Sequence, residues 1–542
     1  MTASALPPST VSAHPVLPAL TVRQYLAERR EIALIDVREE DPFAHGHPLW
    51  AANLPLSRLE LLAWTRIPRR DTVVVVYGEH DGIDLAPRAA QVLAGLGYTA
   101  VHLLEGGLQG WIDSGGELFI DVNVPSKAFG ELVEARRHTP SLEAKQVKAL
   151  LDSQADVVVV DARRFDEFQT MSIPTATSVP GGELVLRVRE LAPDPATTVI
   201  VNCAGRTRSI IGTQSLINAG LPNPVAALRN GTIGWTLAGQ QLDRGASRQA
   251  PEAVGEDNRA RAREGARAIA ERAGVRRIAP DAVAALDEPG RTLYRFDVRT
   301  AQEYQRGHLP GFRHAPGGQL VQETDHHAPV RGARIVLADD DGVRADMAAS
   351  WLAQMGWEVW VVEPTGADAR TAGGPASDAI PEAPSVQTVT PARLQAWCGD
   401  KEEDRPVILD VGPGVSYLAR HVPGAWYAIR SQLAQALARV PGSRRYVLTC
   451  GTGLLARFAA QDLRELTDAE VWVLEGGTTA WMDAGLPVET GESRLAVPRT
   501  DRYRRPYEGT DNAAAAMQAY LDWEFGLIAQ IERDGTHNFR VV

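Results

Sequence analysis

The chain has few cysteines and no extended apolar run. Its 542 residues include three cysteines, Cys203, Cys398 and Cys450, which are too few for a disulfide framework. No apolar stretch approaches the roughly 18 residues that cross a bilayer. The first residues, Met1 to Pro8, also lack the charged and apolar regions of a secretion signal. We therefore expect a soluble protein of the reducing cytoplasm.

Positive charge is also scarce. The chain has 56 Lys and Arg against 68 Asp and Glu, which gives a formal net charge of −12. Nucleic acids and anionic membranes need a basic face, so we expect neither as a partner, although a few local arginines can still hold a small anion. The histidines show no spacing with cysteines or carboxylates that is typical of a metal site, so no metal is expected.

The sequence does contain one segment four times. Four short apolar runs end in an aspartate, and the position 19 residues later is Pro55, Pro180, Pro316 or Ile429. A second apolar run ends 42 residues after the aspartate in three copies and 40 in the fourth. The four aspartates, with the residue that ends the second run, are Asp36 and Gly78, Asp161 and Cys203, Asp297 and Asp339, and Asp410 and Cys450. Copies one, two and four close with a glycine-containing turn and Trp111, Trp235 or Trp481, which we expect to anchor the core.

Each copy alternates short apolar strands with amphipathic helices. This pattern is typical of an α/β unit in which helices flank both faces of a parallel sheet. The predicted units are residues 1–125, 138–246, 275–365 and 386–492, followed by a C-terminal helical tail at 493–542. Polar stretches at 126–140, 245–274 and 365–384 are interpreted as linkers, the second with a composition compatible with a helix.

The cysteine of the second copy lies in a favourable setting. The strand 198–202 ends at Cys203, a short loop follows, and a helix can begin near Thr207. Backbone N–H groups, the positive end of the helix dipole and nearby guanidinium groups all stabilise a thiolate in such a place. The alternative is a buried, inert cysteine at a strand end.

The residues of this loop carry a family resemblance. Cys203, four intervening residues and Arg208, together with the aspartate starts, the sequence His308-Leu309-Pro310-Gly311 and the glycine turn before tryptophan, resemble rhodanese-type sulfurtransferases. The chain is similar to a tandem of four rhodanese-like domains. Phosphatases of the same fold use a loop one residue longer, so the resemblance disfavours a phosphatase.

The resemblance implies a mechanism and a set of site residues. Cys203 would take sulfur from thiosulfate or a persulfide and pass it to a thiol or to cyanide, without a metal or organic cofactor. Arg208 and Arg206 would hold the anionic donor, and the loop amides would stabilise the persulfide; the loop residues concerned are Ala204, Gly205, Thr207 and Ser209.

The other copies depart from this pattern. Gly78 and Asp339 replace the nucleophile, so copies one and three are expected to be inactive, with Arg344 pairing with one of Asp339, Asp340 and Asp341. Copy four keeps Cys450 but has Leu455 where the arginine stands, and it is either a secondary sulfur site or a retained non-catalytic cysteine. A non-enzymatic scaffold or sulfur-carrier protein is the rival interpretation.

Two structural expectations complete the analysis. The aspartates paired with Arg38, Arg163 and Arg299 are expected to orient a loop rather than to act as bases. In the tail, Asp511 or Asn512 is expected to cap a helix that docks on a neighbouring domain or on a second copy, which leaves a homo-oligomer open. The alternative is a lid that brings Arg504 or Arg505 to the catalytic cleft.

Overall fold

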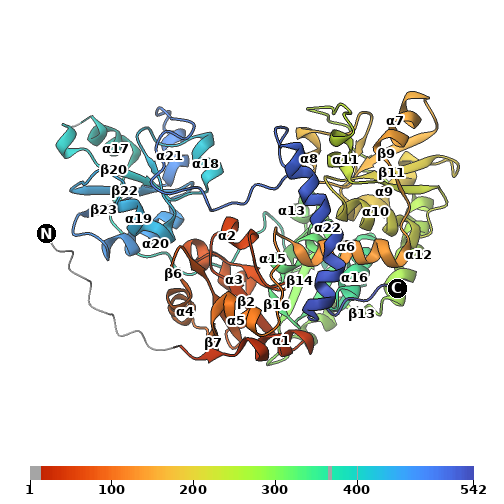
Figure 1. The fold of residues 1–542 in the computed structure, drawn as a ribbon, viewed down its shortest axis with the longest axis horizontal. Helices are drawn as coiled ribbons and strands as arrows, with labels where there is room; N and C mark the ends of the chain where they lie inside the picture. The colour runs from red at the N-terminus through yellow and green to blue at the C-terminus, as the bar shows by residue number, and fades with distance from the viewer. Residues whose placement is uncertain (1–13, 364–368, 400) are drawn as a thin grey trace.

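The computed structural model describes residues 14–363, 369–399 and 401–542. It contains four α/β domains whose parallel sheets share one strand order (Figure 1). In the second domain, for example, the order is β8-β12-β11-β9-β10. The predicted fold class, with helices flanking parallel sheets and a C-terminal helix, is confirmed.

The bounds of the strands and helices follow the repeat. Domain 1 holds β1 (Val16–Leu17), α1 (Ala19–Ala27), β2 (Ile32–Asp36), α2 (Glu40–Ala44), β3 (Ala52–Asn53), α3 (Leu59–Arg66), β4 (Val74–Tyr77), α4 (Ala86–Gly95), β7 (Val101–Leu104) and α5 (Gly107–Asp113), with the small hairpin β5 (Glu79–His80) and β6 (Ile83–Asp84). Domain 2 holds β8 (Ser141–Leu142), α7 (Ala144–Asp152), β9 (Val157–Asp161), α8 (Phe165–Thr170), β10 (Thr177–Ser178), α9 (Leu184–Leu191), β11 (Thr198–Asn202), α10 (Thr207–Asn218), β12 (Val225–Leu228) and α11 (Gly231–Leu237).

Domains 3 and 4 repeat the order. Domain 3 holds β13 (Arg276–Ile278), β14 (Leu293–Asp297), α13 (Ala301–Arg306), β15 (Arg313–His314), α14 (Gly317–Gln322), α15 (Thr324–His327), β16 (Val330–Arg331), β17 (Arg334–Ala338), α16 (Arg344–Gln354) and β18 (Glu358–Val362). Domain 4 holds β19 (Thr388–Val389), α17 (Pro391–Cys398), β20 (Val407–Asp410), α18 (Gly414–Ala419), β21 (Trp426–Tyr427), α19 (Leu433–Leu437), β22 (Arg445–Thr449), α20 (Leu454–Arg464), β23 (Glu470–Leu474) and α21 (Gly477–Asp483).

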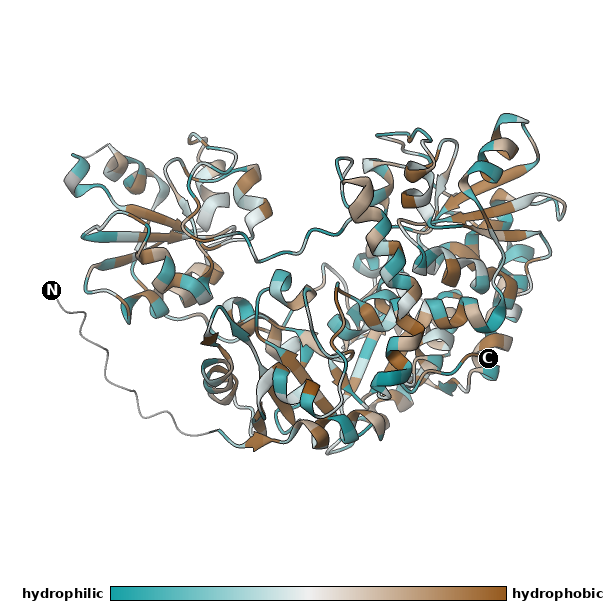
Figure 2. Cartoon of the chain, viewed as in Figure 1, coloured by the Kyte–Doolittle hydropathy of each residue, from teal (hydrophilic) through white to brown (hydrophobic). Residues whose placement is uncertain are grey.

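The central strands are apolar because both faces of each sheet are covered. All residues of β2 and β4 are buried, and brown is common on the sheet strands in Figure 2, where the helices carry both teal and brown. Continuous Val and Ile runs are the pattern of buried parallel strands. The three closing tryptophans, Trp111, Trp235 and Trp481, are buried as expected.

The predicted linker at 126–140 does separate domains 1 and 2, and it is largely helical. Most of it belongs to helix α6 (Val124–Arg137), which is buried from Val124 to Val133 and packs against α10 of domain 2. Its polar residues Lys127 and Glu131 are buried beside charged partners, because Lys127 pairs with Asp121, six residues earlier, and Glu131 pairs with Arg206 of domain 2. The second linker does contain a helix, α12 (Glu256–Arg272), which lies between α9 and α16.

The backbones of domains 2 and 3 approach each other closely at two glycines, Gly182 and Gly318. A Cβ atom on Gly182 would lie 2.8 Å from the amide nitrogen of Gly318, at the start of α14. No side chain fits there, so the two glycines let α14 approach the segment that follows β10. Domain 3 also joins domain 1, because β16 pairs antiparallel with β2.

The tail returns from domain 4 to domain 2. It passes domain 1, where the Tyr503 amide donates to Glu40, and then forms α22 (Ala514–Asp534), which packs along α6 (Figure 1). The predicted cap is wrong: the helix begins after Ala513, while Asp511 pairs with Arg504 and Asn512 donates to the carbonyl of Glu508. Docking on a neighbouring domain is confirmed. No helix within the described residues is long and apolar enough to traverse a bilayer.

Candidate active site

Cys203 follows the last residue of β11, at the carboxyl edge of the domain 2 sheet. The neighbouring strand β9 ends at Asp161, which accepts a hydrogen bond from Asn202 Nδ2 at 2.8 Å. Arg163 donates to both Asp161 oxygens and, at 2.6 Å, to the carbonyl of Met171. The aspartate–arginine pair therefore orients the segment after α8, as expected, and its equivalents Asp36–Arg38 and Asp297–Arg299 do the same.

The glycine turn at the start of α11 holds the loop that begins at Cys203. Gly231 has φ +53°, and a Cβ atom on it would lie 2.4 Å from the carbonyl oxygen of Cys203. The amides of Thr232 and Ile233 donate to the carbonyls of Cys203 and Ala204 at 2.8 and 3.0 Å. A side chain at Gly231 would separate these groups, which explains the glycine in the closing turn.

The Cys203 thiol is enclosed. The residue is 1% exposed, and its Sγ lies 3.4 Å from Ser209 Oγ, to which the S–H donates. Burial raises the pKa of this thiol, while the positive charge of Arg208 and hydrogen bonds from the side chain and amide of Ser209 act to lower it. Arg208 and Ser209 therefore oppose the effect of burial on this pKa without cancelling it.

Arg208 is held by a residue that the sequence analysis missed. Its guanidinium donates to both oxygens of Glu167 on α8, at 2.8 and 2.9 Å. Burial acts to raise the pKa of Glu167, but the positive charge of Arg208 outweighs this effect and helps to lower the pKa to about 2. The carboxylate therefore stays charged and fixes the guanidinium. The repeat contained the signal: Glu167 lies six residues after its aspartate, and Glu303 lies at the same distance in the copy that keeps Arg344.

Arg206 faces a different set of groups. It donates to both oxygens of Glu131 on α6, at 2.7 and 2.8 Å, to Glu134, and to Asn230 Oδ1. Its guanidinium also lies 4.1 Å from the ring centre of Phe525. Two carboxylates therefore already neutralise Arg206, and its predicted contact with the donor stays a prediction.

The tail forms a roof over the loop. A Cβ atom on Gly205 would lie 3.1 Å from Cε1 of Tyr520, so this ring rests directly on the loop. Tyr520 donates to Glu524 at 2.8 Å, and Thr207 also donates to Glu524 at 3.5 Å. Glu524 is fully buried, and burial raises its pKa to about 8. Helix α22 thus places a proton-bearing carboxyl beside the loop.

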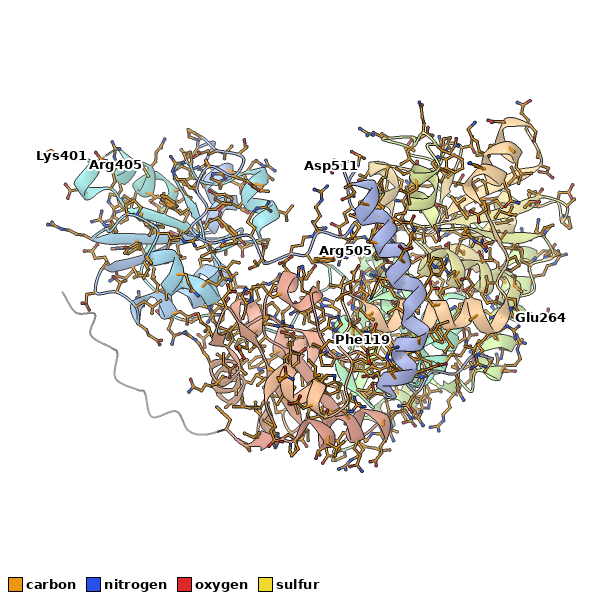
Figure 3. The ribbon with its side chains drawn as sticks, in the orientation of Figure 1. Phe119, Glu264, Lys401, Arg405, Arg505 and Asp511 are labelled. Atoms are coloured by element: carbon orange, nitrogen blue, oxygen red, sulfur yellow. The ribbon has the colours of Figure 1, made fainter. Side chains whose placement is uncertain are left out.

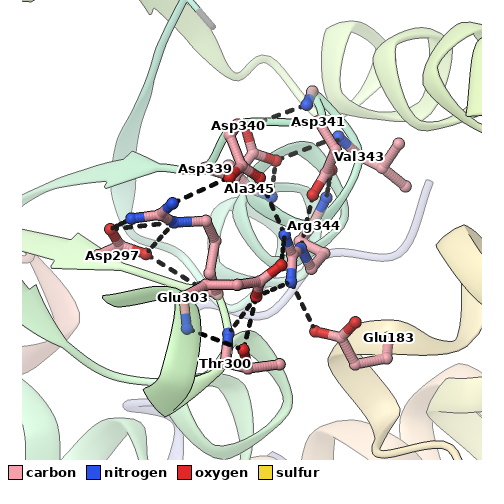
Figure 4. A network of polar contacts seen from close by, with 12 residues as sticks. Glu183, Asp297, Thr300, Glu303, Asp339, Asp340, Asp341, Val343, Arg344 and Ala345 are labelled. Atoms are coloured by element: carbon pink, nitrogen blue, oxygen red, sulfur yellow. Dashed lines mark hydrogen bonds and ion pairs between the residues drawn. The ribbon is translucent and has the colours of Figure 1, made fainter. Parts of the chain in front are cut away.

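In domain 3 a carboxylate fills the position of the thiol. Asp339 accepts hydrogen bonds from the amides of Gly342, Val343 and Ala345, at 3.1, 3.1 and 2.9 Å (Figure 4). Arg344 is surrounded by four carboxylates, which are Asp340, Asp341, Glu303 and, across the domain boundary, Glu183. The expected pairing of Arg344 with this aspartate cluster is confirmed. The carboxylate of Asp339 therefore already accepts from the loop amides that could otherwise bind an anion.

Domains 1 and 4 differ from both. In domain 1 a Cβ atom on Gly78 would lie 2.5 Å from Val37 Cγ2, so a cysteine has no room there. In domain 4 the amides of Gly453, Leu455 and Ala456 donate to Cys450, which retains the amide cradle. Burial raises the pKa of this thiol, and Asp410 raises it further. With Leu455 in place of arginine, no guanidinium from that position offsets these effects.

Asp410 itself gives a testable pH dependence. Gly412 stands where the other domains have an arginine, and burial raises the pKa of Asp410 to about 6. An ordinary aspartate titrates at about 3.9, so the stability of domain 4 falls as the pH rises from about 4 to about 6, where the unfolded chain has lost this proton and the folded chain still holds it, and the loss persists at higher pH. We expect Asp410→Asn to stabilise domain 4 by about 1–3 kcal/mol at pH 8 and to change little below about pH 4.

Urea unfolding followed by hydrogen exchange on domain 4 peptides, with wild type and variant compared at each pH, measures this difference. Asp161→Asn is the matched control, because it leaves Arg163 without its counter-charge and should destabilise domain 2. Equal stability of wild type and Asp410→Asn at pH 8 would contradict the assignment.

No group of three or more His, Cys, Asp or Glu side chains within the described residues is placed to hold a metal ion. Cys398 lies at the end of α17, away from the loops.

Comparison with known proteins adds to this geometry. The model of the rhodanese-like domain matches residues 21–114, 143–238, 279–364 and 390–484. The chain belongs to the rhodanese family. The four matched rhodanese-like domains correspond to the four sheets, while α6, α12 and α22 lie outside the matched segments.

Relatives of these rhodanese-like domains include whole-chain and single-domain proteins. A crystal structure of a thiosulfate sulfurtransferase from Pseudomonas aeruginosa is 61% identical, with a TM-score of 0.95, over 97% of this chain and 100% of that one. The uncharacterized protein YqhL of Bacillus subtilis is 36% identical over 18% of this chain and 73% of its own length. The thiosulfate sulfurtransferase YnjE of Escherichia coli is 32% identical over 26% of this chain and 32% of its own length.

Proposed function

We propose that the protein is a sulfurtransferase in which Cys203 carries sulfur from thiosulfate or a persulfide to a thiol or cyanide. The observation that carries the proposal is the loop of domain 2, which combines a cysteine with an arginine five residues later. In this loop Arg208 is fixed by Glu167, and Ser209 donates its amide to the sulfur. Relatives described as thiosulfate sulfurtransferases support the same reaction class.

The reaction divides into two displacements. The Cys203 thiolate attacks the outer sulfur of thiosulfate, the S–S bond breaks, and sulfite leaves with the electron pair. The acceptor then attacks the outer sulfur of the Cys203 persulfide, and the thiolate leaves. Arg208 and the Ser209 amide stabilise the negative charge that the sulfur carries before and after each step. Neither step needs an external oxidant or reductant.

The remaining domains support this site in the proposal. Asp339 occupies its own cradle, Gly78 leaves no room for a thiol, and Cys450 lacks the arginine. Domain 3 contributes to domain 2 directly, since Arg344 pairs with Glu183. The rival interpretation, a non-enzymatic scaffold, assigns the same supporting role to domain 2 as well.

Intact-mass measurement separates these two interpretations. After treatment with thiosulfate and removal of the excess, we expect the protein to gain one sulfur atom, which peptide mapping places on Cys203 and which cyanide then removes. A scaffold gains no sulfur. Sulfur found only on Cys450 would also overturn the assignment.

A further inference from the structure

A cavity of about 440 Å³ lies between α6, α22 and the last residues of the chain. Its volume falls within the range of small-molecule sites. Figure 3 shows α22 running from the labelled Asp511 past the labelled Phe119, and the cavity borders the second half of this helix. The described residues that line it include none of the Cys203 loop, so the cavity is separate from the site of the proposed reaction.

Positive charge predominates in the lining. Arg136 and Arg137, in the last turn of α6, are exposed and form no hydrogen bond or ion pair with any described residue. Arg540 donates to the carbonyl of Ala273, which leaves most of the five N–H donors of its guanidinium for a ligand. Among the described lining residues, Glu532 is the only acidic one. Three guanidinium groups against one carboxylate favour an anionic ligand.

The rest of the lining is mostly apolar and partly open. His537 is the exception: its Nδ1 accepts from the amide of Phe539 at 2.9 Å, so the proton of the neutral ring lies on Nε2, which can donate. A ligand with an apolar body would cover side chains that are half-buried in the protein alone. The apolar residues of the lining are Leu132, Ile528, Ile531, Phe539 and Val541.

The wall that the chain end contributes is held in place. The Arg540 amide donates to the carbonyl of Gln354 at 2.8 Å, and the Val542 amide donates to Oε1 of the same glutamine at 2.9 Å. Gln354 is the last residue of α16, so the chain end is attached to domain 3. The cavity is therefore preformed, which lowers the cost of ordering it around a ligand.

We propose that this cavity binds a small amphiphilic anion, with a carboxylate or phosphate headgroup at the three arginines and an apolar body against α22 and the chain end. The inference goes beyond the proposed function and does not depend on it. Guanidinium forks match the geometry of both headgroups. The ligand would contact the two helices that reach the catalytic loop, because α6 holds Arg206 through Glu131 and α22 rests on Gly205.

Octanoate and octyl phosphate test the assignment, because each joins an anionic headgroup to an apolar chain. Calorimetric titration of the full chain, below the micelle concentrations, should give one site per chain for at least one of them, and the tighter ligand identifies the headgroup. Acetate lacks the chain and octanol lacks the charge, so both should bind at least about tenfold more weakly.

The chain offers a matched set of arginines for the test. Arg136→Ala combined with Arg137→Ala should lower the affinity for the tighter ligand about ten- to hundredfold, since both arginines line the cavity. These positions are exposed, so the double variant should fold. Arg533→Ala is the control, because Arg533 is exposed on α22, pairs with Glu117 and does not line the cavity.

Three results would overturn the site. They are the absence of binding by both amphiphiles, equal affinity in wild type and the double variant, and an equal loss in Arg533→Ala, which would assign the effect to net charge alone. Octanol binding as tightly as the anions would also overturn it, because the arginines would then contribute nothing. Sulfur loading of Cys203 is measured without these ligands, so failure of the proposed function would leave the outcome of the titrations unchanged.

Discussion

Cys203→Ser should abolish sulfur transfer from thiosulfate to cyanide, while Cys450→Ser should retain it. A serine hydroxyl is a far weaker nucleophile than a thiolate, and it cannot form a persulfide. The hydrogen bond with Ser209 and the support from Gly231 do not depend on sulfur, so the variant should fold. Initial rates of thiocyanate formation, with thermal unfolding as a check on folding, measure both variants.

The two cysteines act as controls for each other. Both end a strand in the same fold, and both have amide donors at the sulfur. They differ in the residue five positions later, Arg208 or Leu455. Equal activity of the two single variants would remove Cys203 from its assigned role, and loss of activity in Cys450→Ser would require a second essential thiol.

Arg208→Ala should lower kcat/KM for thiosulfate by about 10²- to 10³-fold, the usual cost of removing one preorganised group from a site of developing negative charge. It should also move the acid limb of the pH–rate profile upward. Burial already raises the pKa of Cys203, and Arg208 is the first of the groups that oppose this, so without it the thiolate forms at higher pH.

The pH profile distinguishes this role from a structural one. Arg208→Lys keeps a charge but loses the fork that binds both oxygens of Glu167, so it should recover part of the pH shift and little of the rate. Arg267→Ala, on the exposed side of α12, is the matched control for loss of an arginine. A lower rate with an unmoved acid limb would assign Arg208 to folding of the loop alone.

The repeat made the fold predictable and singled out Cys203 as the candidate nucleophile. Cys203 and Arg208 are close in sequence, and the same spacing in Asp339 and Arg344 allowed copies to be compared position by position. The same comparison of copies could have identified Glu167, because Glu303 lies at the equivalent position of the third copy. For Asp410 the sequence gives only half of the answer. It shows Gly412 in place of an arginine, but the raised pKa of Asp410 depends on the burial of its carboxyl, which only the structure shows.

Contacts between distant segments could not be predicted. The partner of Arg206 is Glu131, 75 residues earlier, and Thr207 meets Glu524, 317 residues later. Neither pair has a local sequence pattern. Glu131 lies on α6, which packs against α10, and Glu524 lies on α22, which packs against α6. The cap prediction failed for a local reason, since Asp511 pairs with Arg504, seven residues earlier, and the helix begins after Ala513.

The roof over the loop has a consequence for synthesis. Tyr520 follows Cys203 by 317 residues in the chain, so at about 5–20 residues per second a ribosome makes the roof roughly 15–60 seconds after Cys203. Domain 2 can fold in that interval, but the loop that carries Cys203 then lacks the contacts of Gly205 with Tyr520 and of Thr207 with Glu524. The contacts that cover the Cys203 loop are therefore among the last to form during synthesis.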